Sequence, residues 1–239
     1  MRKDHRPYII KKAWLDLQKW YARYFLKPQF DKLGKGCTFM RPWHVEIFGS
    51  RIELGKFATV IATSDKKIRL AVWGRNTEDG QIKIGNYCLI SPGVRISAAE
   101  KIIIKDSCMF ASRVYVTDSD WHDIYDRAAF GVPAPVIINE NVWIGDGAVV
   151  CKGVNIGKNS VVGAGSVVTK NIPENVIAAG NPAVVIRHLD SEKDMKTRAN
   201  WLSDPVRLAK EFDMMDRENL AGNSLSGWIR SRLFPRSSD

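Results

Sequence analysis

An aliphatic residue returns at every sixth position through the middle of this chain. Between residues 138 and 168 the series has no slip and consists of Ile138, Ile144, Val150, Ile156, Val162 and Val168. The same spacing runs upstream through Ile84, Ile90 and Ile96 and, after a slip of two residues, through Ile104, Phe110 and Val116. A period of six fits neither the helical period of about 3.6 residues nor the simple alternation of a strand. The repeat therefore predicts a regular unit of a different kind.

The other positions of the hexad are restricted as well. A glycine often follows the aliphatic residue, as at Gly145, Gly157 and Gly163, and the position four residues after each aliphatic is small or β-branched. This pattern predicts a solenoid in which each hexad forms one short strand and one turn. The aliphatic and the small residue point inward, and the glycine relieves the backbone at the corner. Cys88 and Cys108 occupy small inward positions, so we expect both to serve packing.

Both flanks of the repeat have helical spacing. In the N-terminal arm apolar residues follow a helical period, lysines lie largely elsewhere, and Pro28 closes the run. After the repeats, Ser203 or Asp204 before Pro205 is typical of a helix start. A last apolar segment, residues 225–234, lies beside several arginines.

These features predict three regions. We expect an amphipathic helical arm at residues 1–35, a repeat domain at 36–187 with a loop insertion at 117–137, and a helical extension at 188–239. A weak hexad that begins at Leu54 suggests the first coil, and residues 64–83 then interrupt the repeat.

Basic charge is concentrated at the N-terminal end. The formal net charge is +10, and residues 1–35 hold ten Lys or Arg against three Asp. Such charge suits nucleic acid, an anionic membrane surface or a phosphorylated cofactor. Because no zinc-finger, RNP or helix-turn-helix pattern occurs, we expect no nucleic acid partner. Lysines around an aromatic helical face favour peripheral contact with an anionic membrane, and the alternative is that this helix packs on the repeat domain or across an oligomer.

Targeting and metal signals are absent from the sequence. The chain has no stretch of about 18 apolar residues and no signal-peptide pattern, which favours a cytoplasmic protein, with the inner face of the membrane as a peripheral site. The four cysteines, Cys37, Cys88, Cys108 and Cys151, form no CxxC pair and show no zinc-site spacing. We expect reduced thiols and no metal.

Three stretches resemble the hexapeptide-repeat acyltransferases, in the branch of galactoside, maltose and polysaccharide O-acetyltransferases. They are residues 141–145 (NVWIG), 162–166 (VGAGS) and 180–183 (GNPA), and the resemblance extends over residues 84–187. It implies a mainly β fold, a left-handed parallel β-helix, here with helices at both ends. It further implies acetyl-CoA as acyl donor, a homotrimer with clefts between subunits, and transfer of acetyl to a saccharide hydroxyl, such as that of a surface polysaccharide or glycolipid precursor.

The repeat breaks after Val116 and resumes at Ile138. In the family a loop at this break carries a histidine into the cleft, and His122 matches it. An imidazole titrates near neutral pH and suits a general base. The resemblance implies that His122 takes the acceptor proton as the acceptor oxygen attacks the thioester. Asp120 is the candidate group to orient this imidazole, with a backbone carbonyl as the alternative.

The resemblance also assigns residues to the reactive end of acetyl-CoA. Trp143 matches a tryptophan that flanks the catalytic histidine and the thioester, and the alternative is a surface tryptophan that fills a subunit contact. The backbone amides near Gly145 and Asp146 match the position that contacts the pantetheine arm and the developing oxyanion.

Further residues match the rest of the cofactor path. Gly163 and Ala164 resemble the small residues that let the backbone approach the pantetheine arm, although ordinary corner geometry would explain them too. Thr169, Lys170 and Arg187 match positions that meet the nucleotide end, where cations suit phosphate charge. The alternative for each is a solvated surface position.

Departures from the family keep other functions open. Ser91 and Ala99 stand where galactoside-type enzymes hold the acceptor with Asn and Asp, and Val184 replaces a second basic residue. A galactoside acceptor is therefore not assured, and an antibiotic O-acetyltransferase or a non-catalytic scaffold are the alternatives. A zinc hydratase of the γ-type carbonic anhydrase kind needs three histidines at one metal, and only His44 and His122 fall near the coils.

Overall fold

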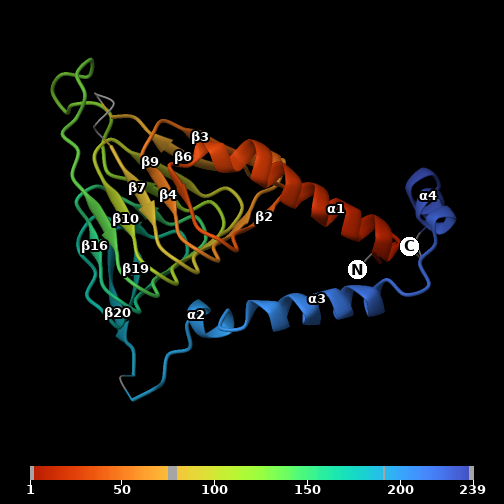
Figure 1. Cartoon of the computed structure of the whole chain (residues 1–239). Coiled ribbons are helices and arrows are strands. Elements are labelled where there is room, and N and C mark those ends of the chain that lie inside the picture. Colours follow the sequence, from red (N-terminus) through yellow and green to blue (C-terminus); the bar gives the residue numbers. More distant parts are fainter. Residues whose placement is uncertain (1–2, 75–79, 191, 237–239) are drawn as a thin grey trace. The chain divides into compact units, whose positions relative to one another are not determined.

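Three sheets of short strands run along residues 21–201 (Figure 1). The structure is a computed structural model that describes residues 3–74, 80–190 and 192–236. Sheet A contains β1 (Lys32–Leu33), β4 (Ile52–Leu54), β7 (Ile82–Ile84), β10 (Ile102–Ile104), β13 (Val136–Ile138) and β16 (Asn155–Ile156). Sheet B contains β2 (Thr38–Met40), β5 (Thr59–Ile61), β8 (Leu89–Ile90), β11 (Met109–Phe110), β14 (Trp143–Ile144), β17 (Val161–Val162), β19 (Val176–Gly180) and β20 (Ala183–His188). Sheet C contains β3 (Val45–Phe48), β6 (Ile68–Val72), β9 (Arg95–Ala98), β12 (Tyr115–Thr117), β15 (Val149–Val150) and β18 (Val167–Val168).

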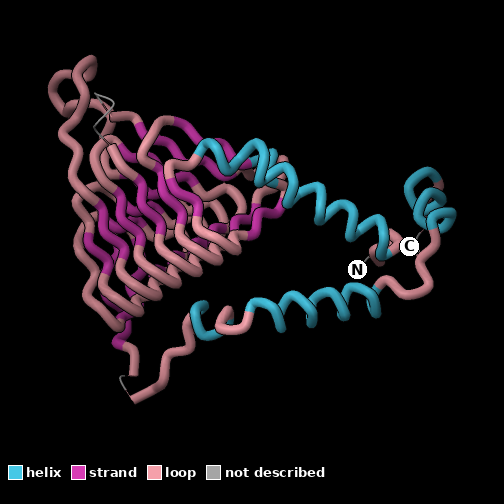
Figure 2. The backbone as a smooth tube through the Cα atoms, in the orientation of Figure 1, coloured by secondary structure: helices cyan, strands magenta, loops and turns pink. Residues whose placement is uncertain are grey.

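The chain visits sheets A, B and C in turn, so strands of successive coils pair in parallel, and the final pair in sheet B, β19 with β20, is antiparallel (Figure 2). The register places equivalent hexad positions beside each other: Ile104 pairs with Ile84 on one side and with Ile138 on the other. Successive strand residues point to opposite faces, so the hexad aliphatics all point inward and are buried. The solenoid predicted from the repeat is confirmed, and so is the left-handed parallel β-helix that the family resemblance implies.

The solenoid begins earlier than the sequence analysis expected. A complete coil, β1 to β3, precedes Leu54, and β6 lies inside the stretch read as an interruption. Part of that stretch, residues 75–79, lies outside the described residues. Leu33, Phe39 and Val45 already carry the six-residue spacing and pack in the core. The signal for the first coil was therefore present, including Gly34 directly after Leu33.

The small inward positions near the corner between sheets A and B form a column of buried side chains. The thiol of Cys88 donates to the Lys105 carbonyl at 3.3 Å, and that of Cys108 donates to the Asn139 carbonyl at 3.0 Å. Each acceptor lies on the next coil, three residues before the next member of the column. Cys88 and Cys108 are fully buried, which agrees with the packing role expected for them.

The helix α2 (Arg198–Trp201) lies against this same corner. The Arg198 guanidinium donates to the Tyr87 carbonyl at 2.7 Å and to the Thr59 hydroxyl at 3.0 Å. The backbone N–H of Ala199 donates to the hydroxyl of Ser107 at 3.3 Å. The corner between sheets A and B is thus covered by the chain's own C-terminal segment.

A second compact unit consists of residues 1–20 and 202–239. It contains α1 (Tyr8–Tyr21), α3 (Pro205–Asn219) and α4 (Leu225–Leu233). The predicted helix start is confirmed, because the Asp204 carboxylate accepts from the Arg207 N–H at 2.9 Å. After α1 the chain continues as a π-helical turn, Ala22–Leu26, and a 3-10 turn, Lys27–Gln29, so Pro28 lies within a turn rather than ending the α-helix.

The helices of this unit are joined through polar side chains. Lys11 of α1 pairs with Asp216 of α3, and the Tyr8 hydroxyl donates to Asp213. The Arg217 guanidinium lies 4.5 Å from the centre of the Tyr8 ring. The Tyr8 hydrogen bond and Arg217 together lower the pKa of Asp213. The two ends of the sequence therefore fold against each other.

Candidate functional site

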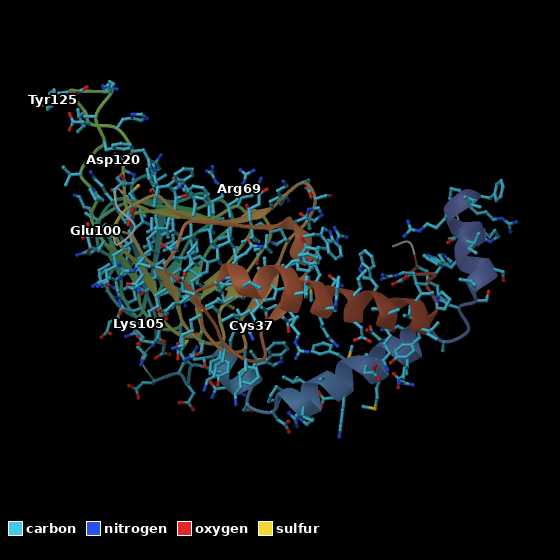
Figure 3. All side chains as sticks on the ribbon, turned by 45° about the horizontal axis from the view of Figure 1, so that its top comes forward. Cys37, Arg69, Glu100, Lys105, Asp120 and Tyr125 are labelled. Carbon is cyan, nitrogen blue, oxygen red and sulfur yellow. The ribbon has the colours of Figure 1, made fainter. Side chains whose placement is uncertain are left out.

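Most of the candidate site residues lie along two corners of the coil. We call the corner between sheets B and C edge BC, and the corner between sheets C and A edge CA. Residues 118–135, here called the His122 loop, leave the coil at edge CA between β12 and β13. The exposed Tyr125 lies at the far end of this loop, away from the coil (Figure 3).

The His122 ring is exposed on this loop and is oriented by the loop itself. Its Nδ1 lies 2.9 Å from the carbonyl oxygen of Arg127. A carbonyl only accepts hydrogen bonds, so in the neutral ring this contact places the proton on Nδ1 and leaves the lone pair on Nε2. The side chain is thus in the tautomer that a general base needs, with the accepting nitrogen away from the loop backbone.

The base of the loop is anchored by Asp118, which is fully buried. Its carboxylate accepts from the backbone N–H groups of Ala99, Glu100 and Lys101 at 2.7, 2.8 and 2.6 Å. Its carbonyl accepts from the N–H of Ala134, at the other end of the loop, at 2.8 Å. Asp118 therefore binds the loop to the preceding coil. It is buried and is not a solvated loop residue.

The other candidate carboxylate, Asp120, has a different partner from the one expected. Its Oδ2 lies 2.5 Å from the Nζ of Lys152, on the next coil. The imidazole Nδ1–H donates instead to the Arg127 carbonyl, so the backbone alternative describes the geometry around His122. Asp123 accepts from the N–H groups of Tyr125 and Asp126 and shapes the tip of the loop.

Trp121, directly before His122, has a backbone conformation that is rare for a bulky residue. Its φ is +63°, in the left-handed region. Its indole N–H donates to the Tyr115 hydroxyl at 3.3 Å, and the Arg95 guanidinium lies 4.4 Å from the centre of the Tyr115 ring. Phe57, Tyr87 and Arg113 have the same conformation at regular corners of the coil, so the position of Trp121 beside His122, and not its φ, makes it a candidate. The sequence analysis gave Trp121 no role.

A hollow of about 370 Å³ lies beside the base of the loop. Trp73, Trp121 and Phe130 contribute aromatic side chains to its wall, and Arg51, Glu100 and Lys101 contribute charged ones. Gly131, which also lines it, runs so close to His122 that an added Cβ would lie 2.8 Å from the His122 carbonyl oxygen. The hollow thus adjoins the backbone that carries the imidazole.

Edge BC gathers most of the residues matched to acetyl-CoA. Trp143, on β14, is 47% exposed on the outer face of sheet B. The Gly145 N–H donates to Val162 and the Asp146 carbonyl accepts from Gly165, which binds successive coils together. The Asp146 carboxylate pairs with Arg113 of the preceding coil. Gly163 and Ala164 follow on the next coil, so these residues form one continuous column.

The remaining matched residues lie elsewhere on the coil. Thr169 and Lys170 follow β18 at edge CA, the same corner as the His122 loop. Arg187 is exposed on β20, the antiparallel strand that closes sheet B. Edges BC and CA are the two borders of sheet C, so within a single chain sheet C separates the edge BC column from the His122 loop. The width of that sheet is one hexad, at most about 20 Å.

Known proteins resemble this chain in sequence and in fold. Residues 135–170 match the family model described as bacterial transferase hexapeptide (six repeats). The galactoside O-acetyltransferase of Lactococcus lactis is 31% identical over 172 residues, which cover 72% of this chain and 69% of that protein. The galactoside O-acetyltransferase of Escherichia coli is 39% identical over 69% of this chain and 67% of its own. The chain belongs to the hexapeptide-repeat acetyltransferases.

A solved structure supports the fold assignment. A hexapeptide-repeat acetyltransferase of Vibrio cholerae, solved with acetyl coenzyme A, aligns with a TM-score of 0.50 and 24% identity, covering 73% of this chain and 80% of that one. Membership of the hexapeptide-repeat acetyltransferases, shown by the sequence relatives, confirms the expected O-acetyltransferase activity with acetyl-CoA as donor. Among the described residues, no helix is long and apolar enough to cross a membrane.

Proposed function

We propose that this acetyltransferase moves the acetyl group of acetyl-CoA to a saccharide hydroxyl, with His122 as general base. The contact between Nδ1 and the Arg127 carbonyl carries this proposal, since it leaves Nε2 able to accept a proton. Nε2 takes the hydroxyl proton as the acceptor oxygen attacks the thioester carbonyl. The carbon–sulfur bond then breaks, and the imidazolium returns the proton to the CoA sulfur. Such a base contributes about 10²–10⁴ in rate.

The donor path in this proposal follows edge BC. Trp143 flanks the thioester, the backbone at Gly145 and Asp146 faces the pantetheine, and Gly163 and Ala164 allow its close approach. Thr169, Lys170 and Arg187 supply donors and positive charge for the nucleotide phosphates. Because Asp146 is paired with Arg113, we assign its side chain to the wall of the path and its backbone to the cofactor.

A complete site in this proposal needs two copies of the chain. The donor column lies on edge BC, while His122, Thr169 and Lys170 lie at edge CA. If edge BC of one copy meets edge CA of the next, all of them line one cleft. A head-to-tail contact of this kind can close into a ring, and the family resemblance implies a ring of three. The helix α2 lies against the third corner, between sheets A and B.

Co-expression of two inactive variants tests the shared site. His122→Ala removes the base, and Ala164→Trp fills the donor column. In mixed rings a site needs an intact loop from one copy and an intact edge BC from its neighbour, so about one quarter of the sites recover. A thiol-release assay on the purified mixture should show that fraction of wild-type turnover. No recovery in verified mixed rings would place the whole site within one chain.

The hollow beside the loop is our candidate for the acceptor subsite. Aromatic side chains present flat apolar surfaces to sugar rings, and Glu100, Lys101 and Arg51 offer hydrogen-bonding partners for hydroxyls. The two related enzymes named above are called galactoside acetyltransferases, and Ser91 and Ala99 depart from that type. Assays with glycans and hydroxyl-bearing antibiotics side by side would decide between the saccharide and the xenobiotic alternative. Turnover of antibiotics alone would overturn the saccharide assignment.

We also propose that the helical unit contacts an anionic membrane from the cytoplasm. The exposed side chains of Ile9 and Leu17 on α1 and of Leu233 and Phe234 at the end of α4 give it apolar surface. Basic residues on the same segments add about 1 kcal/mol each near an anionic surface. The full-length protein should float with anionic vesicles but not with neutral ones, and Leu17→Glu should reduce flotation. Equal partitioning of the full-length protein with anionic and neutral vesicles, or no flotation with either, would remove the membrane contact.

A further inference from the structure

The two arms of the His122 loop are joined at successive levels. At its base the Ala134 N–H donates to the Asp118 carbonyl at 2.8 Å. Near its tip the Asp123 N–H donates to the Ala129 carbonyl at 3.0 Å. Between these levels the connection is made from outside the loop, by a side chain of the neighbouring coil. That side chain is Lys152.

Lys152 holds both arms with one ammonium group. Its Nζ lies 2.5 Å from Oδ2 of Asp120, on the arm that leads to His122. The same Nζ donates to the carbonyl of Val132, on the returning arm, at 2.8 Å. Lys152 follows β15 at edge CA, and the N–H of the next residue, Gly153, donates to the Ala134 carbonyl at 2.9 Å. The anchor therefore stands on the regular part of the coil.

We propose that Lys152 is a positioning residue for acetyl transfer, an inference that rests on the proposed role of His122 as general base. The path from the ammonium to the imidazole is short. Gly131 directly precedes Val132 in the chain. It packs so closely against the His122 carbonyl that there is no room for a Cβ on Gly131. A shift of the returning arm therefore moves the His122 backbone. Asp120 then acts on the histidine through Lys152 and not through a hydrogen bond to the ring.

The exposure of the Lys152–Asp120 pair predicts that its loss will lower the catalytic rate more than the stability of the fold. The side chains of Lys152 and Asp120 are 31% and 50% exposed, and ion pairs in contact with water contribute little to stability. A displacement of a catalytic group by about 1 Å can lower a rate by about 10²-fold. Loss of the clamp should therefore lower kcat and leave the melting temperature nearly unchanged.

The test compares Lys152→Met, Asp120→Asn and the double variant. We expect each to lower kcat by about 10- to 100-fold, with the double variant no worse than either single one. The KM for acetyl-CoA and the shape of the pH–rate profile should be those of the wild type, and Lys152→Arg should recover part of the loss. Lys105→Met, which removes a similar exposed pair with Glu140 at 3.4 Å, is the matched control.

Hydrogen exchange of the loop amides provides a second measurement that does not depend on turnover. In Lys152→Met the amides of residues 119–133 should exchange faster than in the wild type and in Lys105→Met. Unchanged exchange would overturn the clamp. A wild-type kcat in Lys152→Met, with Asp120→Asn slow and its pH profile shifted, would also overturn it, because Asp120 would then act on the ring directly. Full turnover in His122→Ala would refute the proposed general base, which is a separate outcome from failure of the clamp.

Discussion

Nδ1 of His122 lies 2.9 Å from the carbonyl oxygen of Arg127, so the imidazole ring is oriented by the backbone of its own loop. This arrangement differs from a triad, in which a carboxylate holds the imidazole and stabilises its charged form. A backbone acceptor fixes the tautomer and the direction of the ring. It cannot be removed by replacing a side chain, so the orientation depends on the shape of the loop.

Replacing His122 with Ala tests the role of the ring. We expect kcat to fall by about 10²–10⁴-fold, because the acceptor hydroxyl then loses its base. The side chain is exposed, so the free energy of unfolding should change by less than about 0.5 kcal/mol. Thiol release and thermal melting measure the two effects. His188→Ala, an exposed histidine on β20, is the control, and equal turnover in both variants would contradict the assignment.

The second prediction concerns two glycines at edge BC. Gly145 and Gly147 lie two residues apart in different surroundings, so substitutions at the two positions should differ in their cost to stability. A Cβ on Gly145 would lie 2.5 Å from the Ala164 nitrogen, whereas nothing lies within 4 Å of one on Gly147. Gly147 has a φ of +67°, a conformation that Asn tolerates. Gly145→Asn should cost about 3 kcal/mol of unfolding free energy, and Gly147→Asn less than about 1 kcal/mol. Chemical denaturation measures both, and similar losses would refute the steric argument.

These glycines also show where the sequence analysis was right and where its reasoning was incomplete. The six-residue period predicted the sheets, the inward aliphatics and the column with Cys88 and Cys108, because strand alternation fixes which side chains point inward. Gly145 was expected to relieve a corner. Its φ is not positive, and the requirement comes from the backbone of the next coil, 2.5 Å from a Cβ there. A single hexad does not reveal how closely its neighbour approaches.

The site could be predicted only in part. His122 was proposed because the repeat breaks around it and the family resemblance implies a histidine at that break. Lys152 was not found, because its partner Val132 is 20 residues away and the meeting point depends on the path of an irregular loop. Asp118 was passed over for the same reason: three backbone N–H groups of the preceding coil make it an anchor, and only the winding of the coil brings them to its carboxylate.

The buried thiol of Cys88 predicts an alkaline loss of stability. Cys108 and burial raise the pKa of Cys88 well above its ordinary value. The folded protein therefore keeps this proton at a pH where the unfolded chain loses it, and unfolding becomes more favourable as pH rises above about 8.5. Denaturation of the wild type and of Cys88→Ala between pH 7 and 11 should show a shallower decline in the variant, by up to about 1.4 kcal/mol per pH unit. Parallel declines would contradict this origin.

The anchor at the base of the loop gives the last prediction. Asp118→Ala leaves the N–H groups of Ala99, Glu100 and Lys101 without their acceptor in a fully buried position, and each unsatisfied donor costs about 1–3 kcal/mol. We expect a loss of at least about 3 kcal/mol in unfolding free energy, measured by denaturant titration, together with loss of turnover. Asp118→Asn keeps the shape and one acceptor oxygen, so its loss should be smaller. Because Asp118 binds the preceding coil and Lys152 belongs to the following one, the two variants separate support of the fold from placement of the histidine. If Asp118→Ala melted like the wild type while losing activity, Asp118 would have to act on the reaction itself.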